Sequence, residues 1–136
     1  MNYLTGLLLI LISGATFADQ YLCKEEHAAG FRYEKSGWVA TKFKADEKFI
    51  IKKPRPKGSD SKMAYVITIL GREYPYGWCN TDFNERGVIG CQLIGGSFTF
   101  NKKSGRFLST YLAGYVDGVD QNTNNPSMQI GTCSPL

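Results

Sequence analysis

Apolar and polar residues alternate in short runs along most of this chain, with the period of two that is typical of β-strands. The strongest run is 64–70, because the five consecutive residues from Tyr65 to Ile69 are all β-branched or aromatic. No run after residue 19 places apolar residues at helical spacing over the ten or more positions that an amphipathic helix needs. The pattern therefore predicts an all-β protein, with strands at 38–43, 48–53, 64–70, 78–79, 88–94, 97–101, 106–116 and 128–133.

Glycine and polar residues separate these runs. Gly95 and Gly96 stand between two predicted strands and indicate a hairpin, because the favoured two-residue turns need positive φ. The segment 106–116 is interpreted as one long strand. The segment 24–29 fits either one helical turn ended by Gly30 or the start of a strand.

Short turns between sequential strands favour an antiparallel meander closed into a small barrel, or a sandwich of two packed sheets. Both architectures hide strand edges that would otherwise pair with other chains. We expect about eight strands in a single domain, residues 19–136. A domain of that size buries about two thirds of the surface that its unfolded chain exposes. Disulfide bonds would therefore add useful stability.

The first 18 residues have the order of a secretory signal peptide. An apolar stretch from Tyr3 to Ile12 precedes small and polar residues, and Thr16 and Ala18 approximate the small-x-small cleavage rule. We therefore expect cleavage after Ala18 and export to the periplasm or the medium. An uncleaved anchor is the alternative, but the apolar run is roughly half of the 20 or so residues that span a bilayer. No transmembrane segment is expected after cleavage.

All four cysteines lie in the mature region, where an oxidising compartment lets them form disulfides. Cys23 and Cys133 lie near its two ends, whereas Cys79 and Cys91 are 12 positions apart. Of the three pairings that four cysteines allow, we therefore expect Cys23 with Cys133 and Cys79 with Cys91. A zinc site is disfavoured, because no Cys-x-x-Cys occurs and His27 is the only histidine.

Short motifs with aromatic, glycine and cysteine residues stand near both ends of the mature region. They are Tyr21-Leu22-Cys23, Gly30-Phe31 with Trp38, Gly114 to Gly118, Asn124-Asn125-Pro126 and Ile130 to Ser134. Together they resemble a family of short exported proteobacterial proteins without an assigned function. The resemblance covers most of the mature chain and implies export and a small β fold, but no particular activity.

The chain is similar, more weakly, to periplasmic inhibitors of c-type lysozyme, which are also small disulfide-bonded β-barrels behind signal peptides. Their inhibitory Ser-Gly-x-x-Tyr motif is not reproduced, because Ser104-Gly105 is followed by Leu108 where the Tyr would stand. No inhibitory residue is carried over. Inhibition of a lysozyme-like or other envelope or host hydrolase is our alternative function.

Side chains for catalysis are scarce in this sequence. Ser-His-Asp or Cys-His chemistry needs a base beside the nucleophile, and His27 stands in a charged run that is typical of a solvated surface. Paired carboxylates for glycoside hydrolysis are a looser requirement, because strand order can bring distant acids together. Most acids lie in charged or turn segments, among them Glu25, Glu26, Asp46, Glu47, Asp82 and Glu85. We therefore interpret the chain as non-enzymatic.

Two segments invite comparison with ligand-binding loops. The glycine-rich stretch 87–96 lacks the Gly-Lys-Ser/Thr of a phosphate-binding loop, and hairpin turns account for its glycines. The loop 117–125 offers oxygen ligands from Asp117, Asp120, Asn122, Asn124 and Asn125, but it lacks the Asp-x-Asp-x-Asp-Gly order and a closing Glu. An Asx-rich turn explains it better, so no metal or cofactor is expected.

Positive charge is concentrated in one segment of a chain whose net charge is +4. Residues 42–62 hold eight basic side chains against three acidic ones, whereas 107–136 holds no basic residue. Lys52, Lys53, Arg55 and Lys57 surround a proline-containing turn that would meet an anionic partner. The alternative is a lysine-decorated edge that discourages strand pairing. Nucleic acid is not expected, because an aromatic-basic repeat is missing.

The sequence thus predicts an exported, periplasmic or secreted, non-enzymatic binding module. Its ligand-binding residues would be Lys52, Lys53, Arg55 and Lys57. Its partner would be lipopolysaccharide, another anionic polysaccharide or an acidic protein. An unrecognised hydrolase is a third hypothesis, and it requires two carboxylates in one cleft.

Overall fold

The structure is a computed structural model that describes residues 20–136. The predicted signal peptide, residues 1–18, lies outside the described residues. The strands are β1 Gln20–Glu34, β2 Gly37–Phe43, β3 Lys48–Lys52, β4 Tyr65–Ile69, β5 Gly77–Cys79, β6 Val88–Leu93, β7 Gly96–Asn101, β8 Arg106–Tyr111 and β9 Ser127–Pro135. Within residues 20–136, no helix has the length and apolar character needed to cross a membrane.

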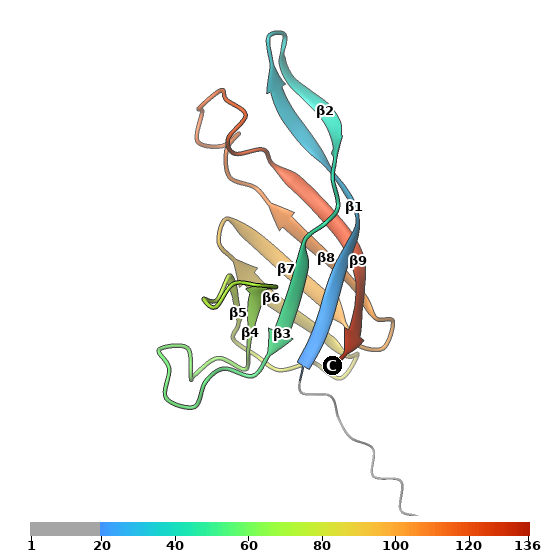
Figure 1. Cartoon of the computed structure of the whole chain (residues 1–136), viewed down its shortest axis with the longest axis vertical. Helices are drawn as coiled ribbons and strands as arrows, with labels where there is room; N and C mark the ends of the chain where they lie inside the picture. Colours follow the sequence, from blue (N-terminus) through green and yellow to red (C-terminus); the bar gives the residue numbers. More distant parts are fainter. Residues whose placement is uncertain (1–19) are drawn as a thin grey trace, which may run out of the picture.

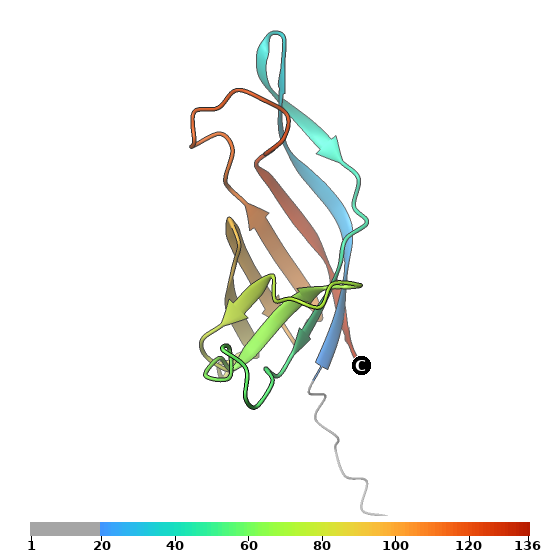
Figure 2. The ribbon, with the colours of Figure 1, turned by 60° about the vertical axis from the view of Figure 1, so that its left-hand side comes forward.

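All nine strands belong to one antiparallel sheet, and eight of them close into a barrel (Figure 1). Their order around the barrel is β1-β3-β4-β5-β6-β7-β8-β9, and pairing of β9 with β1 completes the ring. The extra strand, β2, pairs with the second half of β1, from Ala28 to Glu34. Figures 1 and 2 show this β1–β2 hairpin extending away from the barrel. The predicted all-β fold is confirmed, and the barrel is the correct choice between the two predicted architectures.

Most predicted strands lie within two residues of their expected bounds. Strand pairing explains the outcome for two further segments, 24–29 and 106–116. The segment 24–29 belongs to β1, because β3, β9 and β2 give that long strand partners along its whole length. The predicted strand 106–116 is too long, since β8 ends at Tyr111. Tyr111 pairs with the first residue of β7 and with the first residue of β9. Beyond Tyr111, β8 therefore has no partner strand on either side.

Alternate residues of the barrel strands point inward and form the core, as the period of two requires. The largest fully buried side chains include Ile51, Ile67, Phe98 and Phe100. Phe83, from the β5–β6 loop, contacts the rings of Tyr21, Tyr65 and Phe100 at centroid distances of 5.8, 5.5 and 5.8 Å. We call this end of the barrel, where β1 begins, the closed end.

Both predicted disulfides are present, Cys23–Cys133 and Cys79–Cys91. Cys23 lies opposite Cys133 in the pairing of β1 with β9, so this bond crosses the seam that completes the ring. Cys79–Cys91 joins the neighbouring strands β5 and β6. Two disulfides indicate an oxidising compartment outside the cytoplasm.

Candidate functional site

Three of the four predicted basic residues line a hollow on the outer face of β4, which we call the β4 hollow. Its volume is about 470 Å³, and Lys52, Lys53 and Arg55 contribute to its wall. Its floor includes Val66 and Thr68, which are only 2% and 3% exposed although they point out of the barrel. Lys57, the fourth predicted residue, does not line the hollow.

Residues of the loops before and after β4 line the hollow together with that strand, and Figure 2 shows both loops next to β4. The first loop, 53–64, is a chain of turns that we call the basic loop. In it, the backbone N–H of Gly58 donates to the carbonyl oxygen of Arg55 (3.2 Å), and that of Ser61 donates to the oxygen of Gly58 (3.1 Å). Pro54 and Pro56 fix the backbone on either side of Arg55. The cationic side chains thus start from a constrained backbone.

The cations of the β4 hollow differ in what surrounds them. The ammonium of Lys53 lies 4.0 Å from the centre of the Tyr65 ring and 3.7 Å from a carboxylate oxygen of Asp82. Among the described residues, Lys52 and Arg55 form no ion pair. Asp60 and Glu73 also line the hollow, and they leave it a smaller positive excess than the sequence count predicts. Lys52 and Arg55 are therefore its available cations.

A second cavity, which we call the barrel mouth, lies at the end of the barrel opposite to the closed end. It has a volume of about 290 Å³. Phe49, Ile69 and Leu93 give it an apolar floor. Its polar lining consists of Glu25, Glu47, Arg72, Tyr76, Ser109, Thr110, Tyr111, Ser127 and Gln129.

The inward-facing positions change from apolar to polar toward the barrel mouth. On β8, the buried Phe107 is followed at the next inward position by Ser109, which is 2% exposed. The hydroxyl of Ser109 donates to the side-chain oxygen of Gln129 (3.0 Å), whose amide nitrogen donates to Ser127 Oγ (2.7 Å). These hydrogen bonds satisfy polar groups that would otherwise be costly to bury.

Glu25 and Glu47 are neighbours on the wall of the barrel mouth. The backbone N–H of Glu25 donates to the carbonyl oxygen of Glu47 (3.1 Å), and the N–H of Glu47 donates to the carboxylate of Glu25 (3.2 Å). Burial raises the pKa of the Glu25 carboxyl, the hydrogen bond from Glu47 opposes this, and the negative charges of Glu47 and Asp46 raise the pKa further. Neither Glu25 nor Glu47 forms an ion pair within the described residues.

Tyr76 stands on another part of the same wall, just before β5. Burial raises the pKa of its phenol, and the neighbouring Tyr111 and Glu47 act in the same direction. The positive charge of Arg72 opposes them. The barrel mouth therefore combines two carboxylates, one guanidinium and aromatic rings around a small space.

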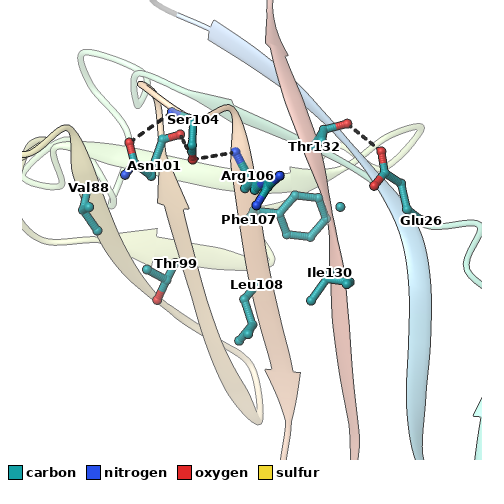
Figure 3. Close-up of a pocket in the computed structure, with 11 residues that line it drawn as sticks. Glu26, Val88, Thr99, Asn101, Ser104, Arg106, Phe107, Leu108, Ile130 and Thr132 are labelled. Carbon is teal, nitrogen blue, oxygen red and sulfur yellow. Dashed lines mark hydrogen bonds between the residues drawn. The ribbon is translucent and has the colours of Figure 1, made fainter.

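A third hollow, of about 540 Å³, lies on the outer face of the barrel (Figure 3). Thr99, Leu108 and Ile130 are neighbours in register on β7, β8 and β9 and lie along it. Leu108 and Ile130 are 38% and 45% exposed. At its edge the hydroxyl of Thr132 donates to the carboxylate of Glu26 (2.9 Å). Leu108 and Ile130 form an apolar strip in this hollow, and several of its polar residues bond to one another, such as Thr132 to Glu26 and Ser104 to Asn101.

The remaining predicted loops and turns have structural roles. Ser104-Gly105, which occupies the place of the inhibitor motif, lies in the β7–β8 turn, where the Asn101 side chain accepts the N–H of Ser104 (3.4 Å). In the Asx-rich loop, Asp120 accepts a hydrogen bond from the indole of Trp38 (3.0 Å). Asn124 accepts one from the hydroxyl of Tyr111 (3.0 Å). These oxygens hold the loop against the β1–β2 hairpin and β8.

Sequence reasoning missed the barrel mouth, because it interpreted Glu25 as a solvated side chain; Glu47, interpreted in the same way, is indeed exposed, but it also lines the cavity. Glu25 is half-buried, and the sequence contains a pattern that predicts this burial. Tyr21, Cys23 and Glu25 alternate along one strand, so a buried Cys23 places Glu25 on the same inner face. The position of Glu47 opposite Glu25 depends on the pairing of β1 with β3, which no local pattern reveals.

Comparison of the chain with protein-family models, curated proteins and solved structures gives no match. The resemblance to a family of short exported proteins therefore stays a prediction, and the candidate sites rest on their geometry alone.

Proposed function

We propose that this protein is an exported, non-enzymatic binding module that holds an anionic group of its partner in the β4 hollow. The observation that carries the proposal is the convergence of Lys52 and Arg55 on one hollow, where no ion pair within the described residues occupies them. A phosphate, sulfate or carboxylate would receive charge-assisted hydrogen bonds there, which are stronger than neutral ones. Lys53 is held beside Asp82 and Tyr65, and the carboxylate of Asp82 offsets part of its positive charge.

The size of the β4 hollow narrows the class of partner. A volume of about 470 Å³ lies within the range of small-ligand sites, about 300–1,000 Å³. It suits one charged sugar unit or headgroup better than an extended protein face. The predicted signal peptide and the two disulfides support a periplasmic or secreted location. An anionic envelope polysaccharide or lipopolysaccharide is therefore the proposed partner.

The arrangement of the carboxylates supports a non-enzymatic role. Glycoside hydrolysis requires two carboxyl groups that flank the scissile bond. Glu25 and Glu47 are instead adjacent on one wall of the barrel mouth, where the backbone of one donates to the carboxylate of the other. This arrangement concentrates negative charge on one side of the cavity.

The test is a binding titration with heparin and with lipopolysaccharide, using charge-reversed variants. Lys52→Glu combined with Arg55→Glu should weaken binding at least about tenfold, because two charge-assisted contacts are lost. Lys57→Glu combined with Lys62→Glu makes the same change of net charge in residues that do not line the hollow, and it should have a much smaller effect.

The same titrations should be repeated at different ionic strengths. Affinity should fall between about 0.01 M and about 0.15 M ionic strength, as the screening length shrinks from about 30 Å to about 8 Å. Equal losses in the two double variants would show a general charge effect without a site. Salt-insensitive binding that is the same for all proteins would rule the proposal out.

A further inference from the structure

The barrel mouth has properties that the β4 hollow does not explain. The ring contacts of Phe83 fill the closed end of the barrel, whereas the opposite end keeps a cavity of about 290 Å³. Eight-stranded barrels have an interior that either fills with side chains or holds one small ligand. In this barrel, side chains fill the closed end, and the barrel mouth leaves room for a small ligand.

The two carboxylates of the barrel mouth lie close together although their charges repel each other. Glu25 on β1 lies beside Glu47, which stands just before β3, and two nearby negative charges repel each other. An apolar side chain in place of the half-buried Glu25 would extend the core formed by Cys23 and Phe49, whereas Glu47 is exposed at the cavity. A half-buried carboxylate beside a like charge costs stability, and such a cost is typical of functional sites.

The charges and rings of the barrel mouth select the ligand chemistry. Two carboxylates without an ion pair favour a cation, and the aromatic side chains of Tyr76 and Tyr111, which also line the cavity, favour one as well. Arg72 also lines the cavity, so one net negative charge remains. The apolar floor of Phe49, Ile69 and Leu93 would accept a hydrocarbon stem.

A metal ion fits the same residues poorly. Calcium takes six to eight oxygen ligands, usually from several carboxylates. Within the described residues, no group of three or more His, Cys, Asp or Glu side chains could hold a metal ion. The cavity is also larger than a bare ion needs.

We propose that the barrel mouth is a binding site for a small organic amine, whose ammonium lies between Glu25 and Glu47 and whose apolar stem lies on Phe49, Ile69 and Leu93. This site is independent of the proposed function of the β4 hollow. The protein would then carry two ligand sites of opposite charge preference, one outside the barrel and one at its open end.

The test compares three probes of one shape at neutral pH: 2-phenylethylamine, 2-phenylethanol and phenylacetate. Calorimetric titration of the oxidised protein should show binding of the amine, with the alcohol at least about tenfold weaker and the acid weaker still. Amide NMR shifts should place the amine at Glu25, Glu47, Tyr76 and Gln129. Absence of amine binding, or equal binding of the amine and the alcohol, would overturn the proposal.

Variants of equal size separate the charge effect from folding. Glu25→Gln and Glu47→Gln should each weaken amine binding about tenfold, while their amide spectra stay those of a folded barrel. Glu85→Gln is the matched control, because Glu85 lies in the β5–β6 loop at the closed end. Undiminished binding by Glu47→Gln, or displacement of the amine by calcium chloride at equal ionic strength, would contradict an amine site.

The two proposed sites can fail separately. The Lys52→Glu, Arg55→Glu variant should bind 2-phenylethylamine like the wild type, and Glu47→Gln should bind heparin like the wild type. Loss of amine binding in the first variant would contradict an independent mouth site.

Discussion

Cys23 and Cys133 face each other across the β1–β9 pairing, with their Cα atoms 3.9 Å apart and their Sγ atoms bonded. They are 110 positions apart in the chain, and they join the first strand of the ring to the last. The covalent bond and the strand pairing thus close the barrel at the same point. Cys79–Cys91, by contrast, spans 12 positions within the ring.

The two disulfides should contribute unequally to stability. In the chain-entropy account, closing the long loop stabilises the fold by about 4.7 kcal/mol and closing the short one by about 3 kcal/mol. Replacement of Cys23 and Cys133 by Ala should therefore lower the free energy of unfolding more than replacement of Cys79 and Cys91. Urea denaturation of the two double variants measures both losses. A larger loss from the Cys79, Cys91 variant would contradict the importance of the seam.

Phe83 should behave as part of the core although it belongs to a loop. Its ring contacts three aromatic side chains of the closed end. Phe83→Ala should cost about 2–3 kcal/mol, slightly below the range for fully buried phenylalanine. Tyr74→Ala is the control, because Tyr74 is another loop aromatic and is 60% exposed. The Tyr74→Ala substitution should change the free energy of unfolding by no more than about 0.5 kcal/mol. Equal losses of stability in the two variants would show that Phe83 is not part of the core at the closed end.

Two glycines in the β6–β7 hairpin should respond differently to alanine. A Cβ at Gly96 would overlap the carbonyl oxygen of Thr110 on β8, whereas a Cβ at Gly90 would meet nothing within 4 Å. Gly96→Ala should cost about 3 kcal/mol, as overpacking does, and Gly90→Ala should change stability by less than about 0.5 kcal/mol. Thermal unfolding of both variants decides this, and similar melting temperatures would contradict the close approach of β7 and β8.

Glu25 should make stability depend on pH. Burial raises the pKa of its carboxyl above the ordinary value of 4.5. A carboxyl with a raised pKa in the folded state favours folding while it is protonated, and this contribution is lost as pH rises through the folded-state pKa. Glu25→Gln should therefore be more stable than the wild type at pH 7, and the difference should vanish well below pH 4.5.

The pH experiment needs a control for general charge effects. Glu85→Gln removes the same charge at the closed end and should show no such pH-dependent gain. Chemical denaturation at several pH values measures both variants. A Glu25→Gln variant that is less stable than the wild type at neutral pH would contradict burial as the dominant influence on this carboxyl.

The strands were predictable because their residues alternate in polarity. The disulfides were predictable because two cysteines lie near the ends of the mature region and the other two are only 12 positions apart. The β4 hollow was predictable only in part. Lys52 and Arg55 stand out in the sequence, but the contact between Lys53 and Asp82 joins residues 29 positions apart. The burial of Val66 and Thr68 on the outer face of β4 depends on loops that fold back over the strand.

The barrel mouth was less predictable still. A period of two places Glu25 on the inner face, yet an inner face at the end of a strand is buried only if the neighbouring loops enclose it. The register between β1 and β3 then decides which charge lies opposite. Long-range pairing, and not local preference, therefore creates the second proposed site.

The most direct test of the proposed function is a map of backbone amide NMR shifts during titration with a sulfated heparin disaccharide. We predict that the largest shifts fall on residues 52–60 and 73–75, around the β4 hollow, and that they diminish as salt is added. Shifts that cluster at the barrel mouth or on the outer face of β8 and β9, or no shifts at all, would contradict an anion site in the β4 hollow.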